Sequence, residues 1–212
     1  MFTVIKADQL GRDTRVQMSR IFAEGYTQWL DYFSKDKNKI ARAFAHMFVL
    51  DQFYIAVTGN KVAGMVACTD GITPSVKLNK KELRKHLGFF KGSIAGFILK
   101  KEFETPLENP SPDKCSIDFV GTAPEFKGQG VASLIIRHIL ENTPYKKYLI
   151  EEVADTNIPA MRLYEKMGFQ EYKRKPFSQK RAKKIGINSL VSFRYVKQSI
   201  DSFKKDENLR SE

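Results

Sequence analysis

A glycine-rich elbow, Lys127-Gly-Gln-Gly-Val-Ala132, is the stretch of this chain whose residues most clearly suggest chemistry. It follows a strand-like segment, 115–122, and the apolar spacing from Val131 to Leu140 predicts a helix directly after it. The first amides of a helix lack intrahelical partners and lie at the positive end of its dipole. The elbow can therefore bind an anion such as a pyrophosphate, and Gly128 and Gly130 permit the backbone angles that close approach requires.

The elbow alone also fits a simpler interpretation, in which the two glycines serve only the turn. It matches neither of the common glycine fingerprints for nucleotides. A second motif supports the binding interpretation: the segment 157–169 reads NIPAMRLYEKMGF. Together the two motifs, which span residues 115–169, resemble the acetyl-CoA-dependent GNAT N-acyltransferase superfamily.

The second motif carries the more specific part of this resemblance. Its matching positions are Asn157, Ala160, Leu163, Tyr164, Gly168 and Phe169. In the first motif, Gly130 and Ala132 match the family, while Lys127 stands where Arg or Gln is usual. A lysine keeps a favourable charge beside a pyrophosphate, so this departure matters little if backbone amides do the binding.

The resemblance implies a mixed α/β (α+β) GNAT fold. Its central sheet would be mixed but mostly antiparallel, splayed between strands 115–122 and 148–153, with helices on both faces. Acetyl-CoA, the co-substrate, would lie in the splay, with a backbone amide near Val120 polarising the thioester carbonyl. The implied cofactor-binding residues are Val120, Thr122, Lys127, Gly128, Gln129, Gly130, Val131, Ala132 and Asn157.

Tyr164 matches the family's general acid, which would protonate the leaving thiolate. The alternative is that Tyr164 belongs to the core, because it shares a helical stripe with Ala160, Leu163 and Met167. Asn157 precedes the helix and can also serve as its N-cap, a role compatible with a contact to CoA. Gly168 is most simply the glycine that ends this helix.

Asp118 is the candidate general base. It shares strand parity with Val120 and Thr122, which predicts that all three side chains face one side of the sheet. A carboxylate within an apolar strand is costly unless it is paired or used. Glu151 and Glu152 are rivals of opposite parity, so only one of them is expected to face the cleft. The alternative interpretation is that all three carboxylates simply pair with nearby lysines.

The family builds its acceptor pocket from two segments that correspond here to residues 26–33 and 173–184. In the first, Trp29 and Asp31 are candidate substrate-binding residues, because an aromatic ring and a carboxylate can hold an ammonium group. The second is strongly basic and is expected to be a solvated loop. Its charge hints at an acceptor that carries negative charge.

The elements that must position these residues follow from periodicity and turn signals. We expect strands at 2–7, 53–58, 61–69, 115–122, 147–153, 170–175 and 189–197, with a two-residue hairpin turn at Gly59-Asn60. Helices are expected after Asp13, from Ile40 to Phe48, at 79–103 in two pieces broken near Gly88 and Gly92, and after Val131 and Asn157. This order predicts one domain, 1–198, with a helical insert at about 71–113 and a polar tail at 199–212.

Composition narrows the possible partners. The chain has 212 residues and a formal net charge of +12, which fits an anionic small ligand, an anionic membrane or nucleic acid, with nucleic acid less favoured because no nucleic-acid-binding motif accompanies the charge. It has no apolar run long enough to span a membrane and no secretory leader, so we expect a cytoplasmic protein without a membrane partner. Cys68 and Cys115 are expected to be buried free thiols, and the three histidines show no metal-ligand spacing, so no metal is expected.

The favoured function is therefore transfer of an acetyl group from acetyl-CoA to a primary amine, by direct attack in a ternary complex. The alternatives are an acyl-CoA sensor or scaffold of the same fold without turnover, and a basic nucleic-acid-binding protein. The sequence does not identify the amine acceptor, the acyl-chain preference or the choice between monomer and homodimer.

Overall fold

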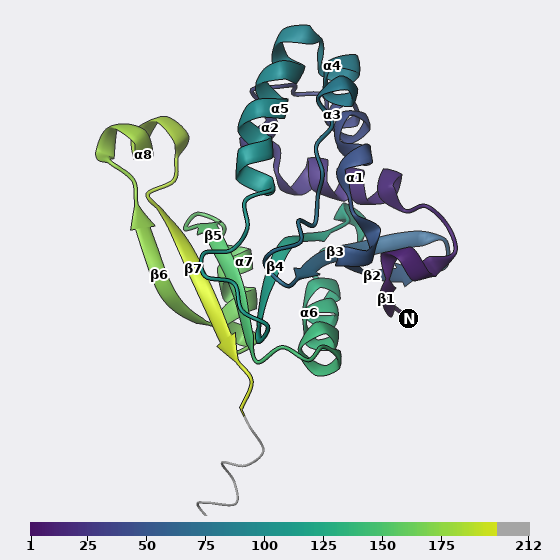
Figure 1. Ribbon diagram of the computed structural model, residues 1–212, viewed down its shortest axis with the longest axis vertical. Coiled ribbons are helices and arrows are strands. Elements are labelled where there is room, and N and C mark those ends of the chain that lie inside the picture. Colours follow the sequence, from purple (N-terminus) through teal and green to yellow (C-terminus); the bar gives the residue numbers. More distant parts are fainter. Residues whose placement is uncertain (199–212) are drawn as a thin grey trace, which may run out of the picture. The chain divides into compact units, whose positions relative to one another are not determined.

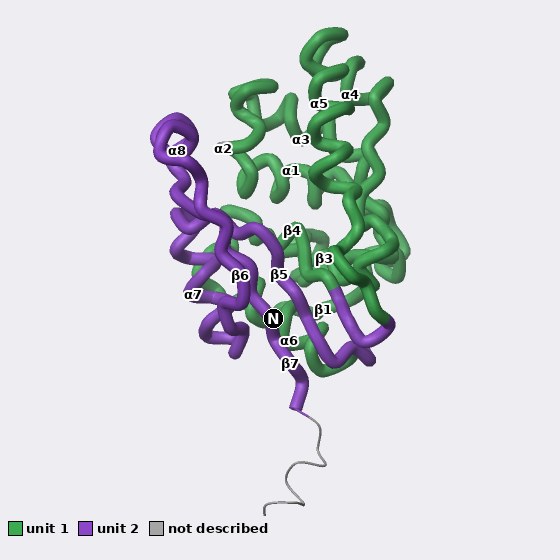
Figure 2. The backbone as a smooth tube through the Cα atoms, turned by 60° about the vertical axis from the view of Figure 1, so that its left-hand side comes forward, with its two compact units in different colours: residues 1–111, 116–143 green, residues 112–115, 144–212 purple. Residues whose placement is uncertain are grey.

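The structure is a computed structural model that describes residues 1–198, apart from the side chain of Gln28. The chain divides into two compact units (Figure 2): unit 1 comprises Met1–Ser111 and Ser116–Thr143, and unit 2 comprises Pro112–Cys115 and Pro144–Glu212. The predicted single domain stays a prediction. The expected polar tail, 199–212, lies outside the described residues.

Unit 1 is built on four strands in the order β1-β2-β3-β4, each antiparallel to its neighbour. Their bounds are β1 Thr3–Lys6, β2 Phe53–Thr58, β3 Lys61–Thr69 and β4 Lys114–Thr122, of which the first two residues of β4 belong to unit 2. The β2–β3 hairpin is confirmed with its predicted bounds. Gly59 at its turn has φ of +53°, which favours glycine.

Helices cover both faces of this part of the sheet (Figure 1). The α-helices are α1 Arg15–Gly25, α2 Thr27–Leu30, α3 Lys37–Phe44, α4 Lys80–Leu87, α5 Phe89–Phe103 and α6 Val131–Asn142; the 3-10 helices are η1 Ala7–Leu10, η2 Ala45–Met47, η3 Leu50–Gln52 and η4 Pro124–Phe126. The core under α1 is aromatic: the Phe22 ring lies 5.4 Å from Phe44 and 6.0 Å from Phe119 between centroids. The opposite face is covered by α6.

Two glycines allow helices to approach the sheet closely. A Cβ at Gly64 on β3 would lie 2.6 Å from Val131 Cγ1, so the first turn of α6 rests directly on that strand. A Cβ at Gly121 on β4 would lie 2.7 Å from Ile21 Cγ2 of α1, on the other face. Contacts this short are not tolerated by a side chain, so both helices are seated where the sheet lacks one.

A β-bulge in β4 overturns the predicted parity of the central strand. Ala67 pairs with Asp118 and Gly64 pairs with Thr122, so β4 uses one residue more than β3 over this interval. Phe119, within the bulge, has φ of +50°. Because the extra residue interrupts the alternation, Asp118 shares the face of Ala67, under α1, while Thr122 shares the α6 face. The prediction that Asp118 and Thr122 face the same way is wrong.

Unit 2 contains three antiparallel strands in the order β5-β7-β6, with β5 Lys147–Ala154, β6 Gln170–Pro176 and β7 Ser189–Val196. Its helices are α7 Ile158–Lys166 and α8 Gln179–Ile185. The Asp113 carbonyl, just before β4, accepts hydrogen bonds from the amides of Lys146 and Lys147 at 2.9 Å each, so β4 and β5 begin beside each other.

The strand β5 carries a second bulge. Ile150 pairs with Phe193 and Val153 pairs with Val191, so three steps along β5 match two along β7. Glu152, inside this bulge, has φ of +55°. The opposite parities predicted for Glu151 and Glu152 therefore do not hold, because both residues oppose Ser192 alone.

The predicted mixed α/β class is confirmed, and most boundaries agree within two residues. One correction concerns the basic segment 173–184, which was expected to be a solvated loop. It forms the end of β6 and the helix α8, whose first turn is capped by Ser178 Oγ accepting from the Arg181 amide at 3.4 Å. The helical insert breaks only at Gly88, and Gly92 lies inside α5. Both cysteines are buried free thiols, as predicted.

Candidate active site

The predicted anion-binding elbow lies between η4 and α6 in unit 1. Gly128 has φ of +78° and Gly130, the N-cap of α6, has φ of +76°. Both values lie in the left-handed region, where other residues are strained. A Cβ at either glycine would meet no atom within 4 Å. The glycines are therefore required by backbone conformation, and the space above them is open.

The elbow presents backbone amides that no part of the described chain uses. They belong to Gly128, Gly130, Val131, Ala132 and Ser133. Gln129 differs from its predicted role, because its amide donates to the Phe126 carbonyl at 3.3 Å and its Nε2 to the Glu125 carbonyl at 3.0 Å. Of the five amides predicted to bind an anion, those of residues 128–132, four have no partner within the described chain, and neither does the Ser133 amide. Gln129 instead stabilises the loop.

Contacts with the sheet fix the elbow in place. The Phe126 ring lies edge-on to Phe2, with centroids 5.6 Å apart. Lys61 Nζ lies 3.8 Å from the Glu125 carboxylate and 6.0 Å from the centre of the Phe126 ring. The Ala123 amide, just before η4, donates to the Ala63 carbonyl at 2.9 Å. Several weak anchors together pre-organise the amides, which reduces the cost of ordering them around a ligand.

Lys127 is exposed at the start of the elbow, where its ammonium group is free to approach a bound anion. Val120 and Thr122 lie at the end of β4, both half-buried, immediately after the bulge at Phe119. A bulge leaves one residue outside the regular ladder of hydrogen bonds. The bulge therefore adjoins the position where the sequence predicts a backbone donor to a carbonyl oxygen.

Asp118 is half-buried beside this bulge. Its Oδ2 accepts a hydrogen bond from Ser116 Oγ at 2.8 Å, two residues earlier on the same strand. This hydrogen bond orients the carboxylate. Asp118 thus has the restricted geometry expected of a base, on the α1 face of the sheet.

The segment 26–33 lies under the same face. The Tyr26 ring stacks 4.8 Å from Phe22 and 5.8 Å from Phe119, which brings the start of α2 to the bulge. Trp29 and Asp31, the residue that caps the end of α2, are both exposed. The two predicted substrate-binding residues are therefore on the surface of unit 1, where an acceptor can reach them.

Tyr164 lies in unit 2, on α7. It is 4 % exposed, and its ring centroid is 5.6 Å from Phe193 on β7 and 6.2 Å from Phe169. The predicted packing role is therefore present. Asn157 is the predicted N-cap of α7, because its Oδ1 accepts from the Ala160 amide at 3.3 Å. Gly168 follows the end of α7 with φ of +85°, as expected for a helix-ending glycine.

The rival carboxylates on β5 both have partners on β6. Glu151 accepts a hydrogen bond from the Tyr172 hydroxyl, and the Glu152 carboxylate lies 3.4 Å from Lys175 Nζ. The alternative prediction, that such carboxylates pair with nearby lysines, is confirmed for Glu152, whereas the partner of Glu151 is a tyrosine. The predicted site residues are divided between the units: Asn157 and Tyr164 lie in unit 2, and the others in unit 1.

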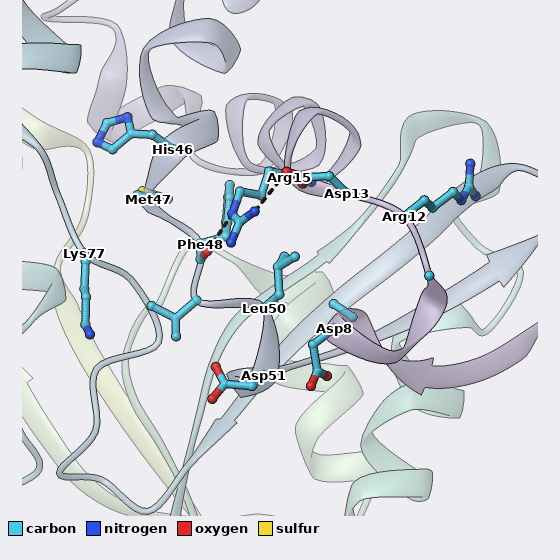
Figure 3. Close-up of a pocket in the computed structure, with 13 residues that line it drawn as sticks. Asp8, Arg12, Asp13, Arg15, His46, Met47, Phe48, Leu50, Asp51 and Lys77 are labelled. Atoms are coloured by element: carbon cyan, nitrogen blue, oxygen red, sulfur yellow. Dashed lines mark hydrogen bonds and ion pairs between the residues drawn. The ribbon is translucent and has the colours of Figure 1, made fainter.

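A separate open depression of about 690 Å³ lies in unit 1 (Figure 3). Figure 3 shows Arg15 bridging its wall: Nε donates to the Phe48 carbonyl at 3.0 Å and Nη1 lies 2.9 Å from Asp13 Oδ2. Its lining comes from η1, the start of α1 and residues 46–51, with Lys77. None of the predicted site residues lines this depression. Among the described residues, no cluster of His, Cys, Asp and Glu side chains is placed to hold a metal ion.

Comparison with known proteins identifies the family. The model of the acetyltransferase (GNAT) family matches residues 16–169. The chain belongs to this family, and it is an acetyltransferase of the GNAT type. The predicted resemblance is thereby confirmed. No curated protein sequence matches the chain significantly.

Solved structures confirm the GNAT fold. An N-acetyltransferase from Staphylococcus aureus Mu50 is 17% identical, with a TM-score of 0.57, over 91% of this chain and 100% of that one. An agmatine N-acetyltransferase is 12% identical, with a TM-score of 0.53, and the match covers 93% of this chain and 100% of that one. A chain of the NatC complex bound to Gag peptide and CoA is 12% identical, with a TM-score of 0.52, and the match covers 93% of this chain and 99% of that one.

Sequence reasoning missed two residues that shape the site. Phe119 forms the bulge with a positive φ, and because it is not a glycine the sequence gives no signal for this conformation. Gly64 seats the first turn of α6 against β3. A glycine inside a strand pattern does suggest a close backbone approach, so Gly64 carried a signal that was not used.

Proposed function

We propose that this protein transfers an acetyl group from acetyl-CoA to a primary amine, by direct attack of the amine on the thioester in a ternary complex. The observation that carries the proposal is the elbow of residues 127–132. Its amides that have no partner among the described residues lie at the start of α6, the space beside Gly128 and Gly130 is open, and the sequence there matches the family's pyrophosphate loop. A helix N-terminus with free amides favours an anionic group by hydrogen bonding and by its dipole.

The amides of Gly128, Gly130, Val131 and Ala132 hold the pyrophosphate of acetyl-CoA, with Lys127 as an additional positive charge. Thr122 and Val120 lie on the strand that leads into the elbow, and Asn157 is a further contact proposed by family resemblance. Acetyl-CoA supplies an activated acyl group. The protein's part is to place the thioester, to stabilise negative charge on its carbonyl oxygen and to move two protons.

The chemical step forms one bond and breaks another. The amine nitrogen attacks the thioester carbonyl carbon, a carbon–nitrogen bond forms, and the carbon–sulfur bond breaks to release CoA thiolate. A backbone amide at the bulge near Val120 stabilises the oxygen that gains charge. The Tyr164 hydroxyl gives its proton to the thiolate. Transfer from a phenol of pKa near 10 to a thiolate of pKa near 8.5 is uphill by roughly 2 kcal/mol, a small part of an enzymatic barrier.

Asp118 takes the proton that the attacking amine must lose. The Ser116 hydroxyl orients its carboxylate at 2.8 Å, whereas Glu151 and Glu152 are engaged by side chains of β6. A positioned base of this kind typically contributes about 100-fold or more to the rate. Trp29 and Asp31, exposed on α2, are the residues proposed to receive the acceptor's ammonium group before it is deprotonated.

The solved structures of this fold do not identify the class of amine acceptor more closely. One is named an agmatine N-acetyltransferase, which indicates a small amine, and another is a complex bound to a peptide. The acceptor is therefore proposed only as a primary amine.

Initial-rate measurements test the function. Release of CoA thiol is followed while acetyl-CoA and each amine of a panel are varied, the panel running from polyamines to peptides. Double-reciprocal plots that intersect are expected, because both substrates must be bound before the amine attacks. Parallel plots would instead indicate a covalent acyl-enzyme and exclude direct attack. If calorimetry detected no binding of acetyl-CoA to the protein, the elbow would be a structural turn without a role in binding.

Replacing Asp118 by asparagine tests the base. We expect kcat/KM at neutral pH to fall about 100-fold and then to recover with rising pH, because the free amine becomes abundant in solution as its pKa near 10.4 is approached. The matched control is Glu152→Gln, which removes a carboxylate of the neighbouring strand and should leave the pH profile unchanged. An Asp118→Asn enzyme with the rate and pH profile of the parent would exclude Asp118 as the base.

A further inference from the structure

The helix α5 is apolar on two opposite faces, and only one of them is buried. Gly92, Ala95 and Leu99 form the buried face. A Cβ at Gly92 would lie 2.5 Å from Arg84 Cα, so α4 and α5 pack at very short distance along this face. A helix that is apolar all round is normally enclosed by other elements. The other face of α5 lacks such cover.

That second face, together with Phe89 at the start of the helix, is the α5 patch. It consists of Phe89, Phe90, Ile94, Phe97 and Ile98. Phe90 is 81 % exposed and Phe97 is 77 % exposed, values rare for aromatic side chains of a folded domain. The last four residues follow helical spacing, so they form one stripe about two turns long. In Figures 1 and 2 the α4–α5 turn lies at the end of unit 1 farthest from β1–β3.

The two helices of the hairpin that carries the α5 patch are strongly basic. Residues 77–103 contain eight Lys and Arg and two Asp and Glu, a formal net charge of +6, which is half of the chain's total. Lys80, Lys81 and Lys101 are exposed and have no acidic partner within 4 Å among the described residues. Lys101 follows Phe97 by four residues and so lies one turn further along the stripe; the eight Lys and Arg of residues 77–103 are called the basic collar.

The end of the hairpin is ordered. The Arg84 guanidinium lies 4.3 Å from the centre of the Phe89 ring, and Arg84 Nε donates to Ser93 Oγ at 2.8 Å. Lys91 Nζ donates to the Phe33 carbonyl at 3.1 Å, which ties the start of α5 to the segment after α2. Because the side chains around the turn are already held, little conformational entropy would be lost when the patch is covered.

We propose that the α5 patch and its basic collar bind an anionic lipid surface, with α5 lying in the interface. Phenylalanine on one side of a helix and lysine around it are the composition of interfacial helices, whose apolar face enters the headgroup region while the cations contact acidic headgroups. The charge argues against a second copy of this chain as the occupant, since two collars of +6 would repel each other.

This inference revises the expectation of no membrane partner, which rested on spanning segments alone. No helix among the described residues is long and apolar enough to cross a membrane. Surface binding requires no such helix, because an amphipathic helix lies parallel to the bilayer. The inference goes beyond the proposed acetyl transfer and does not depend on it.

Vesicle flotation tests the proposal with the full chain. Vesicles of phosphatidylcholine alone are compared with vesicles of equimolar phosphatidylcholine and phosphatidylserine, at low and high ionic strength. The protein is expected to float only with the phosphatidylserine vesicles, and less at high ionic strength. Absence of binding at low ionic strength, or equal binding to both kinds of vesicle, would overturn the proposal.

Matched variants separate insertion from simple charge attraction. Phe90→Ser with Phe97→Ser should weaken binding on the order of tenfold per phenylalanine. Lys80→Gln with Lys81→Gln should weaken it about fivefold per lysine, whereas Lys183→Gln with Lys184→Gln, which removes the same charge from α8, should have little effect. Equal losses for both lysine pairs, or no loss for the phenylalanine pair, would mean adsorption of a basic protein and would overturn the proposal.

Fluorescence supplies an independent readout. Trp29 is the only tryptophan, so Phe90→Trp in a Trp29→Phe background reports on the patch alone. A blue shift of its emission with phosphatidylserine vesicles is expected. An unshifted spectrum would overturn the proposal. Light scattering that showed a dimer in the parent protein and a monomer in the Phe90→Ser, Phe97→Ser variant would also overturn it, because the patch would then be a dimer interface.

Discussion

Replacing Tyr164 by phenylalanine is expected to lower kcat at least about 100-fold, the usual minimum contribution of a positioned general acid. The substitution removes only the hydroxyl, so the ring still packs on Phe169 and Phe193. Acetyl-CoA affinity should stay within about twofold, because binding rests on the elbow in this proposal. Rates of thiol release and calorimetric titration of acetyl-CoA measure the two quantities separately.

The control for this prediction is Tyr195→Phe. Tyr195 is also a tyrosine of unit 2, and its ring lies 5.5 Å from Phe169, so both variants remove a phenol from the same aromatic cluster. Its turnover should match that of the parent protein. If Tyr164→Phe kept the parent's kcat, Tyr164 would have a packing role only and another group, or water, would protonate the thiolate.

Replacing Gly130 by valine is expected to weaken acetyl-CoA binding by at least about tenfold, because a left-handed conformation costs a non-glycine residue roughly 1–2 kcal/mol and more when it is β-branched. Gly130 has φ of +76° and caps α6. The added side chain would also occupy the open space above the amides. Calorimetric titration with acetyl-CoA, and with CoA separately, measures the loss.

Gly11→Val is the matched control for this experiment. Gly11 has φ of +75°, and a Cβ there would also meet no atom within 4 Å, so the backbone strain is the same. Gly11 follows η1, away from the elbow, and its replacement should cost stability without changing acetyl-CoA affinity. Equal effects of the two substitutions on affinity would mean that general destabilisation, and not the elbow, explains the loss.

Local signals were sufficient for most of the secondary structure. The hairpin of residues 53–69, the elbow and the caps at Asn157 and Gly168 depend on the preferences of a few adjacent residues. Such preferences act in the same way wherever the segment lies in the fold. The basic segment 173–184 was the exception, since its helix was mistaken for a loop. Ser178 before a run without Gly or Pro was the signal for α8.

The face of the sheet on which the candidate base, Asp118, lies was decided by strand pairing. Parity along β4 predicted that Asp118 and Thr122 share one face, and the bulge at Phe119 placed them on opposite faces. The bulge at Glu152 likewise removed the opposite parities assumed for the carboxylates of β5. Neither bulge is marked by a glycine. Each bulge arises because two paired strands use different numbers of residues over the same interval. The sequence of one strand alone does not determine how it pairs with a distant segment.

The sequence by itself thus determined the family, the glycine elbow that is proposed to bind an anion, and the residue types proposed for proton transfer, because these rest on short-range patterns. Only the tertiary structure decided which amides of the elbow remain open, which face Asp118 occupies and that α5 buries one apolar face while exposing the other. The physical reason is the same in each case. Burial, strand register and hydrogen-bond satisfaction depend on neighbours that are remote in sequence, and they exist only once the chain has folded.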